Sequence, residues 1–468
     1  MSLEDRYKPL IVAGPGNPMH NARTFLQGVY TRNRRPILIH LRGSFYAWNG
    51  TRWQEIDDAT IRAELYTGFE PAKYPRPIDG GGKELVKFSP NRSKIANLLE
   101  ALEAVTKQPS TLTSPQWFPD AGIERNVPAD KVIACRNGLL HVTTRRLWPH
   151  MPEFFNTTCV PFDYDPDAPT PQRWLTFLKE LWDDDQQSID CLQDIFGYVI
   201  SGDTSLQKMF LLVGPRRSGK GTIARILTEL VGRDHVVGST LASLGSNFGL
   251  APLVDASVTF IGDARLPKKG DNSIITERML AISGEDTLTV DRKYRPHWTG
   301  KLPARIFVLS NELPRLDDVS GALASRFIIL TLTRSFYGRE NRRLFDELRE
   351  ELPGILNWAL DGLDRLTGAD RFIQPESSAE QIRELEDLSS PVGAFIRDCC
   401  QTGPDHEVKA DKLYEAWRDW NDDQGYRNVS TVQTFGRDLR AAVPALTVTR
   451  PRDAIGRRYR VYHGVGLA

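Results

Sequence analysis

The middle of the chain predicts a covered parallel sheet, because short apolar runs alternate with segments of helical periodicity. Strands that are apolar throughout are typical of a sheet with helices on both faces. A helix is expected over GTIARILTELVG, ending at Gly232. The four runs are QKMFLLV from 207, ASVTFIG from 256, ARIFVLS from 304 and RFIILTLT from 326.

Weaker patterns flank this core. Asn49-Gly50 and Asn137-Gly138 indicate hairpin turns between alternating segments. Helical spacing recurs at 92–106, in RWLTFLKELW from 173 and across 340–366, whereas Pro375 to Glu380 has the composition of a linker. After the linker, AEQIRELEDL is helical again. In the last part, three helical segments (391–400, 409–422 and 430–442) precede two strands, as in a winged helix.

These patterns together predict an α/β core with a covered parallel sheet, an α+β N-terminal region and a C-terminal winged-helix domain. The expected divisions are an N-terminal α+β region for assembly or substrate contact (1–125), a lead-in domain (126–204), the core with the sheet (205–340), a helical lid and linker (341–388) and the winged helix (389–468).

Composition narrows the classes of protein. Lys plus Arg and Asp plus Glu are both 60 in 468 residues, so only local basic patches point to nucleic acid. The five cysteines lack metal-binding spacing and are expected to be reduced. No run of 18 apolar residues occurs, and the first residues lack a signal-peptide core. We therefore expect no membrane contact and a cytoplasmic location.

A phosphate-binding loop stands between a predicted strand and a predicted helix. Backbone N–H groups and a helix N-terminus converge on phosphate in such loops, and a lysine adds charge. Here the pattern G-x-x-x-x-G-K is complete, but glycine follows the lysine where Ser or Thr is usual. The loop, with the residues expected to bind nucleotide, is Gly214, Pro215, Arg216, Arg217, Ser218, Gly219, Lys220, Gly221 and Thr222.

Three further polar residues follow in an order that hydrolysis requires. Asp263 ends the second apolar run, where an acid activates water or holds metal. Asn311 ends the third and is placed to orient the attacking water. Arg326 precedes the fourth and is placed to stabilise transition-state charge on a neighbouring subunit's nucleotide. Each residue alone has a plain structural reading, but the ordered set predicts an ATPase.

With these motifs, residues 205–340 resemble the superfamily 3 helicases, and most closely the phage and plasmid group related to the poxvirus primase-helicase. VPFDYDPDAPTPQRWLTFL, CLQDIFGYVISGDTSLQKMFLLVGP, NGLLHVTTRRLWPHMPEFFNTT and LSNELPRLDDVSGALASRFIIL carry the likeness, over roughly 130–370. The resemblance implies that Lys220 is the Walker A lysine, Asp263 the Walker B acid, Asn311 the sensor and Arg326 the arginine finger. It implies ATP and Mg²⁺ as cofactors. It also implies an α/β P-loop NTPase fold of AAA+ type for the ATPase core (205–340), preceded by a helicase lead-in domain (126–204).

The magnesium ligands depart from that pattern. Gly221 and Gly262 stand where related enzymes carry a hydroxyl and a first acid. Thr222 is expected to supply the hydroxyl, as in the similar G-K-G-T loop of adenylate kinases, and Asp263 the carboxylate. A contribution from Glu277 or Asp286 stays open, because nothing in the sequence selects either.

Two basic segments are candidates for DNA binding. TVDRKYRPHWTG is similar to the DNA-gripping hairpin of papillomavirus helicases, with Lys293-Tyr294 between Arg292 and Arg295. Residues 433–460 carry seven arginines and two aspartates. Their alternative roles are a solvated turn and a basic protein-interaction surface. The arginines expected on the recognition helix and wing are Arg437, Arg440, Arg457 and Arg458.

We therefore expect a ring-forming, ATP-dependent DNA helicase, a hexamer acting on single-stranded and forked DNA in the replication of a phage, plasmid or integrated element. The resemblance implies 3′-to-5′ movement. No carboxylate constellation for primer synthesis is found, since DYDPD (163–167) has the composition of a loop. A separate primase or polymerase is thus the expected partner. The alternatives are a DNA-bound assembly or origin-binding ATPase without unwinding and, since adenylate kinases share G-K-G-T, a small-molecule kinase.

Overall fold

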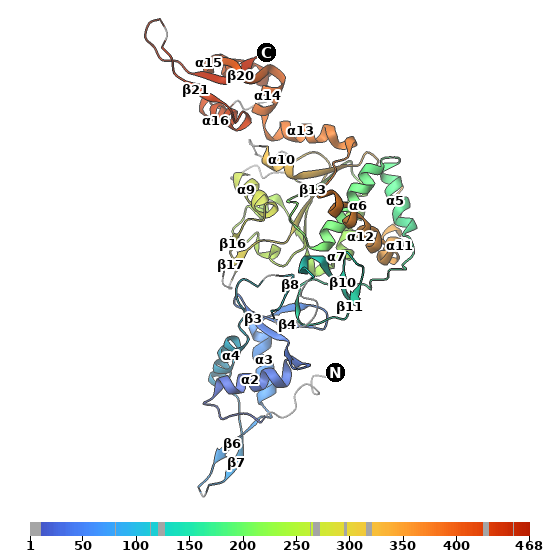
Figure 1. The fold of residues 1–468 in the computed structure, drawn as a ribbon, viewed down its shortest axis with the longest axis vertical. Helices are drawn as coiled ribbons and strands as arrows, with labels where there is room; N and C mark the ends of the chain where they lie inside the picture. Colours follow the sequence, from blue (N-terminus) through green and yellow to red (C-terminus); the bar gives the residue numbers. More distant parts are fainter. Residues whose placement is uncertain are drawn as a thin grey trace.

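The computed structural model describes residues 11–79, 81–112, 114–119, 127–262, 264, 272–293, 297–314, 321–424, 430–452 and 454–468. The N-terminal region lies at one end of the molecule, the central sheet with its helices in the middle, and the C-terminal region at the other end (Figure 1). Within the described residues, no helix has both the length and the apolar character needed to cross a bilayer.

A five-stranded parallel sheet forms the core, as the apolar runs predict. Its order is β14 (Val236–Ser239), β15 (Val258–Gly262), β18 (Arg305–Ser310), β13 (Met209–Val213) and β19 (Phe327–Thr331). Four of these strands were predicted; β14 was not, because VVGS is short and only partly apolar. The strand before the phosphate loop, β13, lies between β18 and β19, so its carboxyl end is flanked by polar residues of neighbouring strands.

Helices cover both faces of the sheet. On one face, Phe210 and Leu212 of β13 pack in a cluster with side chains of α5 (Gln172–Trp182), α6 (Gln186–Ser201), α7 (Lys220–Val231) and α12 (Leu352–Ala369). Helices α6 and α12 cross closely, because a Cβ on Gly197 would overlap the carbonyl oxygen of Ala359. On the other face, the cluster includes residues of α8 (Leu241–Leu244), α9 (Asn272–Ser283) and α10 (Ala322–Arg326).

The N-terminal region is α+β, as predicted. Helix α4 (Arg92–Thr106) has the predicted limits and packs with α2 (Pro18–Val29) and α3 (Asp58–Phe69) against a meander of β3 (Leu38–Leu41), β4 (Ser44–Trp48) and β5 (Trp53–Ile56). The Asn49-Gly50 turn joins β4 to β5. Two smaller hairpins are β1 (Thr31–Arg32) with β2 (Arg35–Pro36), and β6 (Lys73–Pro77) with β7 (Lys83–Lys87), the latter projecting from the end of the molecule (Figure 1).

The lead-in region connects this part to the sheet. The second predicted hairpin is present as β9 (Val132–Cys135) and β10 (Gly138–His141), which β11 (Leu147–Trp148) extends. Strands β8 (Gln116–Trp117) and β12 (Phe154–Phe155) pair beside it. DYDPD is a loop, as predicted, and its Asp163 pairs with Arg136 at 2.8 Å.

Short 3-10 turns occur in several parts of the described chain. They are η1 (Ala129–Lys131), η2 (Arg233–His235), η3 (Ala251–Leu253) and η4 (Glu376–Ser378).

The linker expected at Pro375 to Glu380 is wrong. The Gln374 side chain exchanges two hydrogen bonds with the backbone of Ile329, at 3.0 and 2.6 Å, which covers the free edge of β19. Ser378 is buried beside Thr331, 3.0 Å between hydroxyl oxygens. This stretch is therefore docked on the sheet. Helices α11 (Leu344–Glu350) and α13 (Ala379–Ser389) lie on either side of α12 in sequence.

The C-terminal region contains the three predicted helices, α14 (Pro391–Cys399), α15 (Ala410–Asp423) and α16 (Val432–Ala442), and the two predicted strands, β21 (Thr447–Thr449) and β22 (Val461–Leu467). A third strand, β20 (Cys400–Lys409), was missed because its exposed polar sequence lacks strand alternation. The strand order is β20-β22-β21, and the chain between β21 and β22 projects at the end of the molecule (Figure 1).

Candidate nucleotide-binding site

The phosphate loop joins the buried end of β13 to the start of α7, as predicted. Gly219 has φ +93°, and a Cβ there would stand 2.8 Å from Leu181 on α5. A Cβ on Gly214 would overlap the carbonyl oxygen of Leu332. Both positions therefore require glycine, one for backbone conformation and close packing and the other for packing alone.

Lys220 lies at the first turn of α7 with its ammonium group turned back into the loop. Its Nζ donates to the carbonyl oxygens of Gly214 at 2.6 Å and Pro215 at 2.9 Å, and to Ser218 Oγ at 3.1 Å. Desolvation by burial lowers the pKa of Lys220. These partners are neutral oxygens, so the ammonium charge is left to be balanced by an anionic ligand.

Asn311 follows β18 and reaches the same point. Because β13 and β18 are parallel neighbours with Val213 opposite Ser310, the residues after each strand meet at one edge of the sheet. Lys220 Nζ lies 3.3 Å from Asn311 Oδ1. The structure thus brings together two residues that the sequence placed in one site.

The metal side of the site contains two open positions. A Cβ on Gly221 or on Gly262 would meet nothing within 4 Å, so packing requires glycine at neither. Thr222 lines the cavity, and its Oγ1 lies 3.4 Å from Arg225 Nη2. Asp263 lies outside the described residues, directly after Gly262 on β15. On the side where magnesium is expected, the described residues thus offer one hydroxyl, that of Thr222, and open space at Gly221.

Several residues that the sequence suggested for this site lie elsewhere. Arg326 Nη1 donates to the carbonyl of Leu280 at 2.6 Å and to Ser283 Oγ at 2.9 Å, at the end of α9. It does not line the cavity that holds Lys220, and neither do Glu277 or Asp286. Within one chain, the arginine is therefore placed away from the loop.

A cavity of about 660 Å³ opens in front of the loop and contains residues that sequence reasoning missed. Seven cationic side chains line it, against two glutamates. The run RENRR from 339 was the available signal, but only the fold shows that it returns to the loop. The missed lining residues are Arg173, Phe177 and Glu180 on α5, with Arg225, Phe336, Arg339, Glu340, Asn341, Arg342, Leu344 and Phe345.

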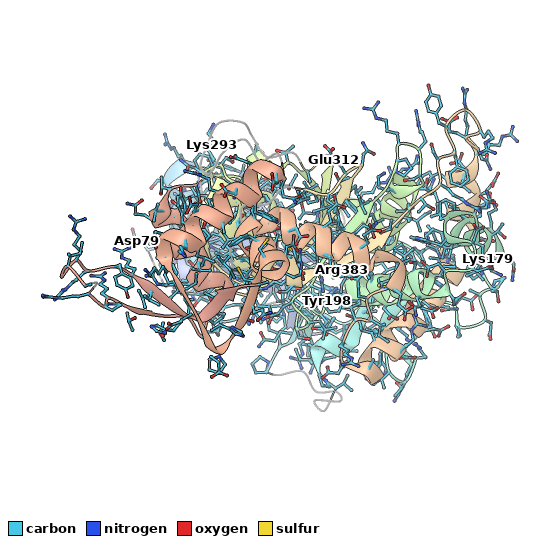
Figure 2. All side chains as sticks on the ribbon, turned by 90° about the horizontal axis from the view of Figure 1, so that it is seen from above. Asp79, Lys179, Tyr198, Lys293, Glu312 and Arg383 are labelled. Atoms are coloured by element: carbon cyan, nitrogen blue, oxygen red, sulfur yellow. The ribbon has the colours of Figure 1, made fainter. Side chains whose placement is uncertain are left out.

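The candidate DNA hairpin exists as β16 (Leu288–Val290) paired with β17 (Trp298–Gly300). Lys293 is exposed in the connecting turn, and Arg292 is half-buried beside it. Tyr294 and Arg295 lie outside the described residues. In the view from above, Lys293 and Lys179 of α5 lie on opposite sides of the molecule (Figure 2). The turn is therefore remote from the α5 side of the nucleotide cavity.

The four C-terminal arginines belong to two structures. Arg437 and Arg440 are on α16, where Arg437 pairs with the buried carboxylate of Asp438 at 3.0 Å. Arg457 and Arg458 lie in the projecting chain between β21 and β22. An isolated bridge between Arg452 and Arg458 holds the two sides of this projection together.

The fold and the site define an NTPase-like α/β protein: a parallel sheet, a phosphate loop before a helix, and a cationic cavity. Three family models match the sequence. They are described as D5 N terminal like (residues 27–183), Family of unknown function DUF5906 (212–326) and Poxvirus D5 protein-like (389–459).

Solved structures of the NrS-1 C terminal region in its apo state share the fold at 12% sequence identity. One covers 92% of this chain and 97% of its own length with a TM-score of 0.50; a second covers 92% and 95% with a TM-score of 0.52. One D5 match precedes the central sheet in the sequence and the other follows it, so the two matches support each other. The matches at 27–183 and 389–459 thus support the likeness of this chain to the poxvirus D5-like primase-helicase group.

Proposed function

We propose that this protein is an ATP-dependent DNA helicase of the superfamily 3 type, which assembles as a ring, with six subunits as the expected number. The observation that carries the proposal is the ammonium group of Lys220, held by neutral oxygens beside Asn311 at the mouth of a cationic cavity. An AAA+ classification of the core agrees with its sheet order and loop position.

In this proposal the loop N–H groups and Lys220 bind the phosphates of ATP. Asn311 orients the attacking water next to the γ-phosphate. Magnesium, when bound to the nucleotide, would screen phosphate charge and be held through Thr222 and Asp263. Arg326 acts on the neighbouring subunit's nucleotide, which its distance from the loop of its own chain favours.

Two surfaces serve DNA in this proposal. The β16–β17 hairpin grips one strand through Arg292, Lys293, Tyr294 and Arg295. The C-terminal region is a winged helix, supported by its element order α14-β20-α15-α16-β21-β22, and its α16 and projecting arginines contact duplex phosphates. Primer synthesis is left to a separate primase or polymerase, and the site of action is the cytoplasm of a bacterial or phage-infected cell.

The decisive experiment is strand displacement on forked DNA with ATP, comparing wild type with Lys220→Ala. We expect wild type to displace the strand and the variant to lose hydrolysis by roughly 10²-fold or more. A wild-type enzyme that hydrolyses ATP and binds DNA without displacing a strand would instead be an assembly or origin-binding ATPase. Phosphate transfer to a nucleoside monophosphate, unaffected by DNA, would identify a kinase.

A further inference from the structure

Residues 335–343, in the chain between β19 and α11, are called the cap segment here, and the first of them are fixed to the phosphate loop. Ser335 Oγ donates to the carbonyl oxygen of Arg216 at 2.8 Å. The backbone N–H of Phe336 donates to the carbonyl oxygen of Arg217 at 2.9 Å. Immediately before, Arg334 forms an ion pair with Asp183 at the end of α5. The cap segment thus begins on the loop itself.

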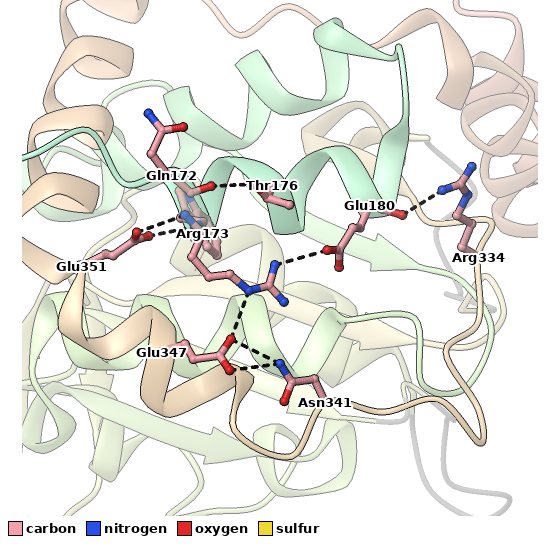
Figure 3. A network of polar contacts seen from close by, with 9 residues as sticks. Gln172, Arg173, Thr176, Glu180, Arg334, Asn341, Glu347 and Glu351 are labelled. Carbon is pink, nitrogen blue, oxygen red and sulfur yellow. Dashed lines mark hydrogen bonds and ion pairs between the residues drawn. The ribbon is translucent and has the colours of Figure 1, made fainter.

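The far end of the cap segment is fixed by a polar network centred on Arg173 (Figure 3). Asn341 Nδ2 donates to both carboxylate oxygens of Glu347, each at 3.2 Å. Arg173 donates to the same carboxylate at 3.1 Å and to Glu180 at 3.2 Å. Hydrogen bonds from Asn341 and Arg173 lower the pKa of Glu347. The far end of the cap segment is therefore held beside the cavity.

Two arginines of the cap segment, one on either side of Asn341, have no protein partner in the part of the chain that the structure describes. Arg339 and Arg342 line the same cavity as Lys220, and among the described residues neither guanidinium forms an ion pair or side-chain hydrogen bond. The two glutamates of the lining are already engaged, Glu180 with Arg173 at 3.2 Å and Glu340 with Arg217 at 3.5 Å. The cavity thus keeps positive charge that the protein does not neutralise.

We propose that Arg339 and Arg342 bind phosphate groups of the nucleotide that Lys220 holds in the same chain, so that the cap segment is a second phosphate-recognition element. A guanidinium presents paired N–H donors that match phosphate oxygens. Since Gly221 and Gly262 contribute no side chain on the metal side, cations from the cap segment offset phosphate charge by another route. The proposal rests on the proposed nucleotide function and assigns its phosphate contacts.

The test measures binding of a fluorescent ATP analogue to the full chain without DNA, with unlabelled ATP, ADP and tripolyphosphate as competitors. The variants are Arg339→Gln, Arg342→Gln and their double. Arg343→Gln is the matched control, because it removes a neighbouring exposed arginine that does not line the cavity. We expect the double variant to bind ATP and tripolyphosphate at least roughly tenfold more weakly, ADP to be affected less, and the control to match wild type.

Unchanged ATP binding by the double variant would overturn the proposal. A variant that binds ATP normally but loses DNA affinity would show that the cap arginines contact nucleic acid instead. Both side chains are exposed and form no ion pair or side-chain hydrogen bond with another described residue, so thermal unfolding should match wild type. If the binding results are as expected but wild type fails to unwind DNA, the helicase function fails and the phosphate assignment stands. If Lys220→Ala abolishes binding and the cap variants do not, only the phosphate assignment fails.

Discussion

Lys220 Nζ and Asn311 Oδ1 lie 3.3 Å apart, although 91 positions separate the two residues in the chain. The parallel pairing of β13 with β18 creates this contact, because Val213 and Ser310 are opposite each other and both chains leave the sheet at the same edge. The lysine proposed to bind phosphate and the amide proposed to orient water are thereby fixed by the same pair of strands.

Asn311→Ala should separate binding from hydrolysis. The Lys220 ammonium keeps its loop partners Gly214, Pro215 and Ser218, so ATP affinity is expected to change little. Loss of the polar group that orients water should slow phosphate release by about 10²-fold. Steady-state phosphate release and analogue binding are to be measured on the same preparation. Equal losses in binding and rate would assign Asn311 to nucleotide affinity instead.

Gly221→Ala and Gly219→Ala form a matched pair with opposite expected effects. Gly221 is in the first turn of α7 with open space around it, so alanine should raise stability by up to ~1 kcal/mol through helix propensity. Gly219 has positive φ and lies against Leu181, so alanine should lower stability by roughly 2 kcal/mol or more. Denaturant unfolding monitored by circular dichroism gives both values. A loss at Gly221 similar to that at Gly219 would contradict the open geometry.

Gly221→Thr tests the magnesium side directly. The open space should accept the side chain without loss of stability and restore the usual hydroxyl position. We expect magnesium to strengthen ATP binding in this variant at least as much as in wild type, whereas Thr222→Ala should reduce that dependence. Analogue binding is titrated with magnesium for each variant. If Thr222→Ala leaves the magnesium dependence unchanged, Thr222 does not supply the hydroxyl.

Lys293→Ala should impair the response to DNA and leave the ATP site intact. Its side chain is exposed in the β16–β17 turn, on the opposite side of the molecule from Lys179 of α5 (Figure 2). Loss of one phosphate contact should reduce the slope of log affinity against log salt by about 1. The matched control is Lys301→Ala, which removes an exposed lysine just after β17. Equal effects of both substitutions would indicate nonspecific attraction.

The pH dependence of stability should carry a contribution from Asp194. Burial raises the pKa of this carboxyl from 3.8 to about 6 despite its ion pair with Arg365 at 2.6 Å. Between these values the folded state binds more protons than the unfolded state, so this contribution to stability falls as pH rises from 3.8 to about 6 and is then constant. Urea unfolding of wild type and Asp194→Asn across this range tests it: their difference in unfolding free energy should change with pH, and a constant difference would contradict the raised pKa.

The sequence was sufficient to predict those elements whose structure is determined by their own residues. Four apolar strands, the loop and α4 depend on local composition and periodicity, and the register of parallel strands then brought Asn311 to Lys220. The cap segment could not be predicted in this way, because its place depends on Arg173, far upstream, contacting Glu347. The docked stretch at Gln374 was missed for the same reason. Its side-chain amide forms hydrogen bonds with the edge of β19, and that edge exists only once the sheet has assembled.

Helix α5 contributes Phe177 and Arg173 to the wall of the cavity, and its Leu181 sets the space allowed to Gly219. The division of the chain at 205 that the sequence favoured thus cuts through the nucleotide site. A fragment containing only 205–340 would lack the wall of the cavity that α5 forms. It would also lack the polar network that holds Asn341 and the packed pair of helices α6 and α12. The smallest piece expected to contain the whole candidate site therefore begins before Gln172 and ends after Gln374, and the lead-in region contributes to that site.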